Sequence, residues 1–413
     1  MKVTDNLTIR SEIPFHMVSD FRFFWSLNEH AYMEMEGLVK AGNVEELFQD
    51  YKGTVVSVEY KEDMVFCGIV TETRMSAEGR LYKMFVRAVS ASLDLDKELC
   101  RELFQDCSYT YCQMISEMAE RQSGSVIGTI GKERIAGPQL CWEETVWEYA
   151  RRIASYLRSC VIADVRTGKP AFWFGLRKGR RIEGHGLSCR GVEVRKMMGG
   201  HGGAKTSYQL NGQESYDLGD EVWMDGAWRV IYEKRAELKK GETVFYYLAA
   251  REKELTQKVI YPKFQTGLSL PGTVEKAEGE RVYIRVDLDG KEGKYPFAWY
   301  PETGTVLYAM PEAGAKAEVC FSGRYDGEIF AVRCRDFMGD RPEEKNLVIP
   351  GKGTMLMDDE QILLEKVSRL NLSDGRISIA GNPAISITAC GKIEVFGRIV
   401  EVISKDEIDF VSE

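Results

Sequence analysis

The C-terminal end of the chain carries a repeat that constrains the fold more than any other feature. Very short strand-like segments recur about every eight residues with no helical pattern between them; they are Ile377–Ile379, Ala384–Thr388, Ile393–Val395, Ile399–Ile403 and Ile408–Phe410. A short-period array of this kind is typical of a β-solenoid or β-helix, in which stacked rungs bury what one rung cannot. A tail of about 65 residues is too short for a stable solenoid of one chain. We therefore expect it to intertwine with other copies.

The first 90 residues show the alternation of apolar and polar residues that is typical of β-strands. Three runs carry it: Gly53–Tyr60, Asp63–Thr73 and Leu81–Val89. A period of two places one face of a strand in a core and the other in solvent. Residues Ser76–Arg80 are typical of a hairpin turn. We expect a β-rich module at this end of the chain.

The middle of the chain is predicted to be partly helical. Apolar residues at helical spacing predict helices over Tyr109–Glu120 and Glu143–Leu157. Glu143 and Glu144 are expected in the first turn of the second helix, where the helix dipole favours anions. Two short strands are expected after it: Val161–Val165 and Ala171–Gly175.

Strand patterns return over residues 185–260 and again from Gly272. In the first region, 219–233 is typical of two strands joined by an Asp-Gly turn. The polar, basic stretch Arg251–Lys263 is interpreted as a connector and a domain boundary. In the second region, four or five short strands within about 65 residues predict a small barrel.

The composition excludes several classes of function. The 413 residues are 44% apolar and carry a net charge of −9, which is typical of a folded protein without the basic surface that binds nucleic acid. No run approaches the ~20 apolar residues that span a bilayer, and the N-terminus lacks the apolar core of a secretory signal. We therefore expect folding in the cytosol. The ten cysteines form no Cys-x-x-Cys pair, which predicts free thiols and no zinc site.

Residues that could carry chemistry are few and scattered. Two carboxylate pairs could flank a glycosidic bond: Glu143/Glu144 and Asp358/Asp359. Helix N-terminal charge explains the first pair and a turn explains the second. Exposed aromatic residues such as Trp223 and Trp228 would suit a glycan- or receptor-binding surface. No catalytic, cofactor-binding or metal-binding residue is assigned from the sequence, and we expect a protein that is not an enzyme and needs no cofactor.

Several segments resemble a known family and follow one another in that family's order. The resemblance starts at Asn28–Ala31 and continues at Val65–Val70. Residues Leu140–Ser155 resemble the family's characteristic helix, ET-x-W-E-x-x-x-R-x-A-S, and Lys169–Gly175 resembles the strand pair after it. Three further segments resemble the family's small barrel: Gly267–Val274, Val282–Asp289 and Tyr308–Gly314. Over most of residues 1–343, the chain is similar to phage late-control and VgrG-like baseplate hub proteins.

The resemblance implies an α+β, mostly β architecture in three parts. These would be a hub region at 1–262, with two tube-like β modules and a helical insert, an OB-fold barrel at 263–343, and a short trimeric β-helix spike at 344–413. Three chains would present six β modules to a hexameric inner tube. The implied function is a structural hub and spike at the tip of a contractile tail or injection system, which joins the tube to the membrane-puncturing tip.

The resemblance also implies partners and a location. The partners would be two further copies of the chain, the inner tube protein, other baseplate proteins, a spike-tip cap protein or effector cargo, and transiently the target cell envelope. The protein would be made in the cytoplasm and assembled into a phage tail or injection particle. Two alternatives stay open, and neither requires a trimer: a peptidoglycan-degrading tail enzyme and a receptor- or glycan-binding tail module.

Overall fold

The structure of the protein is a computed structural model, which describes most of the chain. The described residues are 1–39, 49–78, 81–183, 186–195, 205–300, 310–323, 328–334, 345–349, 353–358, 360–373, 375–381 and 383–408. The chain divides into two compact units, Met1–Arg335 and Asp336–Glu413, which we describe separately. The finer division at residues 262 and 343 stays a prediction.

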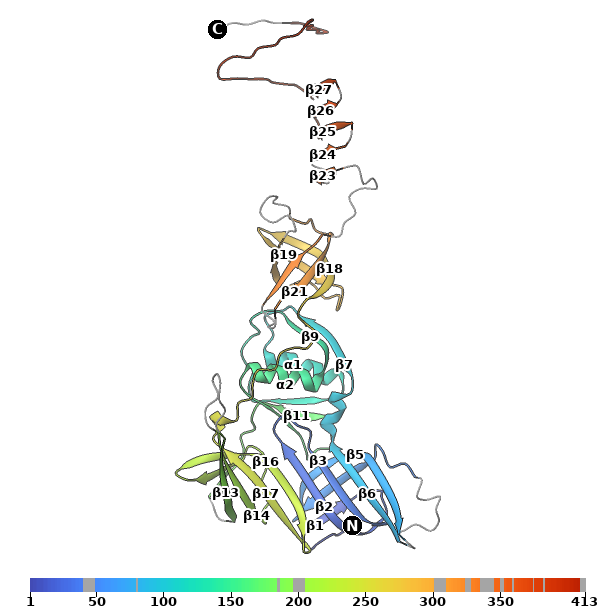
Figure 1. Ribbon diagram of the computed structural model, residues 1–413, viewed down its shortest axis with the longest axis vertical. Helices are drawn as coiled ribbons and strands as arrows, with labels where there is room; N and C mark the ends of the chain where they lie inside the picture. Colours follow the sequence, from blue (N-terminus) through green and yellow to red (C-terminus); the bar gives the residue numbers. More distant parts are fainter. Residues whose placement is uncertain are drawn as a thin grey trace. The chain divides into compact units, whose positions relative to one another are not determined.

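The first unit is built on one long sheet (Figure 1). Its strands follow the order β1-β4-β5-β6-β3-β2-β16-β17-β14-β13, and β15 pairs with β16 and with β12 beside this path. One half of the sheet comprises β1 (Leu7–Arg10), β2 (Phe15–Ser26), β3 (Tyr32–Val39), β4 (Val55–Tyr60), β5 (Asp63–Glu78) and β6 (Leu81–Ser90). The other half comprises β12 (Arg181–Ile182), β13 (Leu187–Arg195), β14 (Lys205–Gly212), β15 (Glu221–Met224), β16 (Ala227–Lys239) and β17 (Glu242–Ala250).

The two halves are joined by the antiparallel pairing of β2 with β16, which runs from Ser26 opposite Glu233 to Arg22 opposite Glu237. One face of the joined sheet buries a single apolar core, to which both halves contribute. The predicted β-rich start is confirmed, because the three alternating runs are β4, β5 and β6 and pair in sequence. The predicted Asp-Gly turn lies between β15 and β16, and both of its residues have positive φ.

A helical layer is inserted in the sequence between the two halves. It contains η2 (Ala91–Asp96), α1 (Tyr111–Arg121), α2 (Val146–Tyr156), a small sheet of β8 (Ser125–Gly128), β10 (Val161–Ala163) and β11 (Ala171–Phe174), and a ribbon of β7 (Leu99–Phe104) with β9 (Gln139–Thr145). The helices and the small sheet share a second apolar core. Both predicted helices and both predicted strands are confirmed.

The start of the second predicted helix was wrong. Glu143 and Glu144 lie in β9, and the helix begins after Thr145, whose side chain accepts a bond from the backbone of Glu148 while the Glu148 carboxylate bonds back to the backbone of Thr145. This reciprocal capping box fixes a helix start. Glu143 has a φ of 53° and is the unpaired residue of a bulge between β7 and β9, so the backbone cannot be helical there.

A buried charge cluster ties the helical layer to the sheet. The Lys234 ammonium, on β16, lies 2.8 Å from the Ser215 hydroxyl and 3.7 Å from the Asp217 carboxylate, with no exposed side-chain surface. Arg166, in the turn between β10 and β11, donates to the other oxygen of Asp217 at 2.6 Å, and Arg177 lies 3.7 Å from it. Burial lowers the pKa of Lys234 to about 8, although Asp217 acts in the opposite direction.

A small barrel follows the sheet in sequence. Residues 251–267 form an irregular connector that contains η3 (Glu252–Glu254), as predicted. The barrel strands are β18 (Leu268–Glu278), β19 (Arg281–Val286), β20 (Pro296–Ala298), β21 (Lys316–Phe321) and β22 (Ile329–Val332), in the order β20-β19-β18-β21-β22. A bridge between Trp299 and Ala331 nearly closes the circle, so the predicted small barrel is confirmed.

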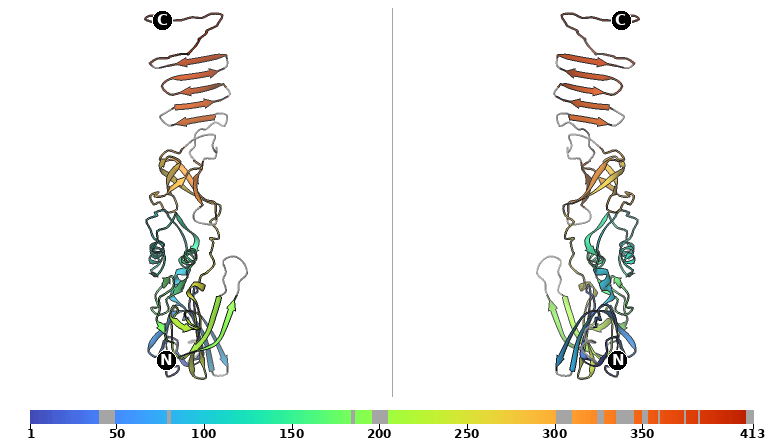
Figure 2. Two further views of the ribbon diagram at one scale, coloured as in Figure 1. Left: turned by 90° about the vertical axis from the view of Figure 1, so that its left-hand side faces the viewer. Right: turned by 90° about the vertical axis from the view of Figure 1, so that its right-hand side faces the viewer.

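The second unit contains a five-stranded antiparallel meander, seen in Figure 2 as a ladder. Its strands are β23 (Lys345–Ile349), β24 (Gly353–Met357), β25 (Gln361–Glu365), β26 (Arg369–Ser373) and β27 (Arg376–Ala380). The first predicted repeat segment lies in β27. The next three, within 384–403, are not strands in this single chain, and the last extends beyond the described residues.

Replacing Lys234 by Met tests the buried cluster. The variant should be at least as stable as the natural protein at pH 7, because a buried ammonium is exchanged for an apolar chain while Asp217 keeps both arginines. Between pH 8 and 10.5 the unfolded chain binds more protons at Lys234 than the folded chain, so the stability of the natural protein rises. The advantage of the variant should therefore shrink by about 3 kcal/mol across this range in urea unfolding.

Lys239→Met is the matched control on the same strand. Hydrogen bonds from Lys239 to Glu237 and Tyr246 raise the pKa of its exposed ammonium, so its contribution is lost only above the ordinary lysine range. The difference in the free energy of unfolding between Lys239→Met and the natural protein should stay constant below pH 10. A constant difference between Lys234→Met and the natural protein would contradict a lowered lysine pKa.

Candidate functional site

The carboxylates of the first candidate pair are each held by an arginine. Arg152, fully buried on α2, donates to both oxygens of Glu144 at 2.8–3.0 Å and to the carbonyl of Leu140 at 2.7 Å. Glu143 bonds instead to the exposed Arg101, with 2.6 Å between Nε and Oε1. The two side chains thus have different partners and different surroundings. This arrangement explains both acids structurally.

The other candidates from the sequence lie apart from one another. Asp358 accepts bonds from backbone N–H groups two and three residues further on, as expected for a turn, and Asp359 lies outside the described residues. Trp223 is 49% exposed and packs edge-on against Trp228, with the two ring centres 5.3 Å apart. The Arg181 guanidinium lies over the Trp228 ring at 5.0 Å. A glycan-binding role for these aromatic residues stays a prediction.

The characteristic helix motif proves to be architectural. Trp147 packs edge-on against the buried Phe172 of the small sheet. The Ser155 hydroxyl donates to the Arg152 carbonyl at 2.6 Å and accepts the backbone N–H of Ile260 at 2.9 Å. The motif therefore shapes α2 and fastens the connector that leads to the barrel.

A Ser-His-Asp constellation, which the sequence analysis missed, joins three elements. The two ring nitrogens of His30 lie 2.8 Å from the Ser92 hydroxyl and 3.2 Å from the Asp96 carboxylate, and the ring stacks on Trp147 at 4.3 Å. Burial raises the pKa of Asp96, but hydrogen bonds from His30 and Thr145 outweigh it and leave that pKa low. Ser92 is fully buried, so its hydroxyl cannot reach a substrate. The network fastens β3 and η2 to the start of α2.

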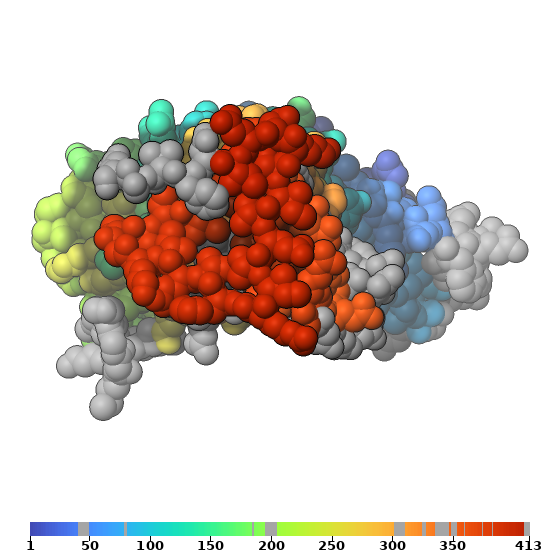
Figure 3. Space-filling view, turned by 90° about the horizontal axis from the view of Figure 1, so that it is seen from above, coloured from blue at the N-terminus to red at the C-terminus, as the bar shows by residue number. Residues whose placement is uncertain are grey.

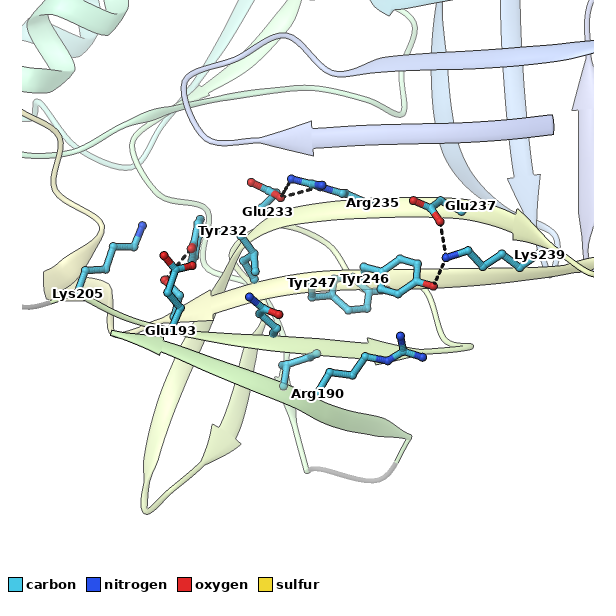
Figure 4. A pocket seen from close by; sticks show the side chains of 14 residues that line it. Arg190, Glu193, Lys205, Tyr232, Glu233, Arg235, Glu237, Lys239, Tyr246 and Tyr247 are labelled. Atoms are coloured by element: carbon cyan, nitrogen blue, oxygen red, sulfur yellow. Dashed lines mark hydrogen bonds and ion pairs between the residues drawn. The ribbon is translucent and has the colours of Figure 1, made fainter. Parts of the chain in front are cut away.

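A surface groove lies on the polar face of the C-terminal half of the sheet, which comprises β12–β17 (Figure 4). It has a volume of about 700 Å³ and is lined by side chains of β13, β14, β16 and β17. The Lys239 ammonium bonds to Glu237 at 2.7 Å and to the Tyr246 hydroxyl at 2.8 Å, and Arg235 pairs with Glu233 at 2.8 Å. Opposite charges therefore alternate along the groove.

The same charge pattern continues onto the N-terminal half of the sheet. Lys83 on β6 pairs with Glu36 on β3 at 2.6 Å. At the joint between the halves, the Arg235 guanidinium lies over the ring of Phe24, its direct partner on β2, at 5.5 Å. The sheet thus has one apolar face, covered by the core, and one polar face on which charges are paired.

The sheet ends in an open edge. In the described part of the chain, β13 pairs with β14 alone and is the last strand in the order of the sheet. Val192 and Val194 are 51% and 55% exposed. An edge strand with free backbone groups and exposed apolar side chains is a template for pairing with another chain. This edge is a candidate assembly surface.

None of the helices among the described residues is long and apolar enough to cross a membrane. Nor do three or more His, Cys, Asp or Glu side chains come together there in a way that could hold a metal ion. His185 and His201 lie outside this part of the chain.

Replacing Arg152 by Ala tests the structural role of the motif. The change leaves Glu144 buried without its main cationic partner, and we expect a loss of about 3–5 kcal/mol in the free energy of unfolding. Arg101→Ala breaks the exposed pair with Glu143 and should cost less than about 1 kcal/mol. Guanidinium unfolding followed by tryptophan fluorescence measures both. Equal losses would contradict the distinction between the two glutamates.

Comparison with known proteins agrees with the resemblance in the sequence. No family model and no curated protein matches the chain. A type VI secretion system component of E. coli, described as similar to the T4 bacteriophage tail proteins gp27 and gp5, has 13% identity, a TM-score of 0.54 and coverage of 79% of this chain and 98% of that chain. A chain of the lidless PdpA–VgrG complex has 7% identity and a TM-score of 0.58, with coverage of 91% of this chain and 98% of that chain. A chain of the half-lidded Francisella PdpA–VgrG complex has 7% identity and a TM-score of 0.57, with coverage of 92% of this chain and 88% of that chain. The resemblance to VgrG-like proteins is thus confirmed at the level of the fold.

Proposed function

We propose that the chain is a structural hub and spike that assembles as a homotrimer at the tip of a contractile tail or injection system. The observation that carries the proposal is an apolar stripe across the second unit, which the single chain leaves uncovered. Of the similar solved structures, one is a type VI secretion system component that resembles T4 tail proteins and another belongs to a PdpA–VgrG complex, which supports the same class of protein.

The register of the five strands defines the stripe. Directly paired residues of an antiparallel sheet share a face. One face therefore carries two apolar rows: Leu347, Met355, Leu364, Leu370 and Ile379, and Met357, Ile362, Leu372 and Ile377. Ile377 is 70% exposed and Ile379 is 56% exposed. A continuous apolar surface of this kind marks a site of association.

The spacing of the stripe continues beyond the last strand. Pairs of apolar residues separated by one residue recur seven or eight positions apart, at Ile385/Ile387, Ile393/Val395 and Val400/Val402, and all six are more than half exposed. Figure 3 shows this segment, in red, as a bent path with its side chains in view. Winding three copies around one axis would supply the missing neighbours and complete a short β-helix spike. The second unit would then fold and assemble in one process.

The first unit would form the ring of the trimer. Its two sheet halves, joined at β2 and β16, provide two modules per chain, so three copies present six modules to a hexameric inner tube. The open edge of β13 would pair with the next copy. The paired charges of the polar face would meet water or a partner without leaving an unpaired charge buried.

The remaining roles follow from the same proposal. The hub would occupy residues 1–262, the barrel 263–343 and the spike 344–413. Partners would be the inner tube, other baseplate proteins and a spike-tip cap or cargo, and the particle would contact the target cell envelope on puncture. Catalysis plays no part in this mechanism, in which the assembled β-structure transmits force.

Light scattering on the full chain and on a chain that ends at residue 344 tests the trimer. The full chain should have a mass of three times 46.9 kDa, and the shortened chain should dissociate at higher concentrations. Ile379→Asp places a charge in the stripe and should raise the concentration of half-dissociation roughly tenfold or more. Ser378→Asp is the control, because it adds the same charge on the opposite face.

Each other outcome has a defined meaning. A full chain that is monomeric at all concentrations would contradict the trimer. A trimer that is unaffected by truncation and by Ile379→Asp would move the main interface to the first unit. Turnover of peptidoglycan, or saturable glycan binding by the monomer that is lost in Trp223→Ala, would favour the alternatives.

A further inference from the structure

The ribbon of β7 and β9 links two cores of the first unit. Leu103 and Leu140 are fully buried in the barrel core, whereas Phe104 and Cys141 belong to the core of the helical layer. The ribbon is therefore one of the links that carry load between the barrel and the helical layer, beside the connector that is bonded to α2. Hydrogen bonds of the ribbon hold them together along six residue pairs.

Two cysteines lie on the same face of this ribbon, one on each strand. Glu102 on β7 is directly opposite Cys141 on β9, and Cys100 lies two residues before Glu102, on the same face of β7. Cys100 and Cys141 are thus diagonal neighbours, next to the bulge at Glu143. The Cys100 thiol donates to the carbonyl of Glu98 at 3.9 Å and the Cys141 thiol to the carbonyl of Glu144 at 3.6 Å, and neither cysteine is in a disulfide.

The two thiols differ in the way that a disulfide-forming pair requires. Cys100 is partly exposed, and its sulfur accepts a bond from the side-chain amide of Gln122 at 3.5 Å. The neighbouring Cys141 thiol and the bond from Gln122 lower the pKa of the Cys100 thiol. Cys141 is fully buried, and its contact with Cys100 and its burial raise its thiol pKa. Because Cys100 is the thiol that a small-molecule disulfide can reach, it is the attacking sulfur.

We propose that Cys100 and Cys141 form an oxidation-dependent disulfide that staples the β7–β9 ribbon. The Cys100 thiolate attacks a small-molecule disulfide such as oxidised glutathione, forms a mixed disulfide and releases one glutathione thiol. Cys141 then displaces the second glutathione and forms the protein disulfide. The two cysteines are oxidised, the glutathione disulfide is reduced, and the two thiol protons end on the two glutathione molecules.

The staple would change the mechanics of the chain after it leaves a reducing compartment. The bond closes a loop from residue 100 to residue 141 that contains α1, and closing a loop of this length restricts the unfolded chain. It also prevents β7 and β9 from separating under load. The inference concerns chemistry within one chain, so it does not depend on the proposed trimer.

Oxidation of the full chain with oxidised glutathione tests the inference. Mass spectrometry without reduction should find a protein lighter by two hydrogens and a peptide that joins Cys100 to Cys141. The melting temperature should rise by a few degrees, and dithiothreitol should reverse both changes. Cys100→Ser and Cys141→Ala should abolish the rise, whereas Cys107→Ser and Cys112→Ser, in the same helical layer, should keep it.

The peptide map of the natural protein decides the question even where a variant folds poorly. A joined peptide with other cysteines, or a glutathione that stays attached to Cys100 without displacement by Cys141, would overturn the proposal. So would a joined Cys100–Cys141 peptide without any rise in melting temperature, because the bond would then not restrain the ribbon.

Discussion

The pairing of β2 with β16 is the contact on which the rest of the first unit depends. It joins strands about two hundred residues apart and merges two half-sheets into one, so that a single core covers one face. The chain leaves the first half-sheet after β6 and reaches the second half-sheet at β12, and the helical layer forms most of the segment between them. The cluster around Lys234 sits on β16 beside this joint and binds the layer through Arg166. The link between the layer and the sheet is thus the pair of Arg166 with the buried Asp217, since removing one partner of such a pair is costly.

Local patterns predicted most elements but few of the contacts between them. Alternation located β4, β5 and β6, and helical spacing located α1 and α2, because both signals arise from which face of an element is buried. The sequence does contain a signal that marks the true start of α2. Thr145 followed by Glu148 is a capping-box pair, and it marks the helix start more closely than the charges of Glu143 and Glu144.

Contacts between distant residues had no such local signal. Lys234 occurs in a strand with an ordinary pattern, and nothing near it in sequence indicates that Asp217 and Arg166 surround it. The same holds for His30, which is more than sixty residues from Ser92 and Asp96 in sequence and meets them only in the folded chain. These groups depend on sheet order, which periodicity does not specify.

In the tail the opposite holds, because the apolar repeat in the sequence extends further along the chain than the strands do. The spacing begins at Leu347 and continues through Val400/Val402, so the meander of β23–β27 and the strandless segment after it share one pattern. The meander forms because each strand finds its partner in the preceding one, yet its apolar face stays open. Beyond β27 the same pattern gains no strand partner within the described chain. In the proposed trimer, the strand partners that this segment lacks would come from the other copies of the chain. The stability of the second unit is then inseparable from the concentration of chains.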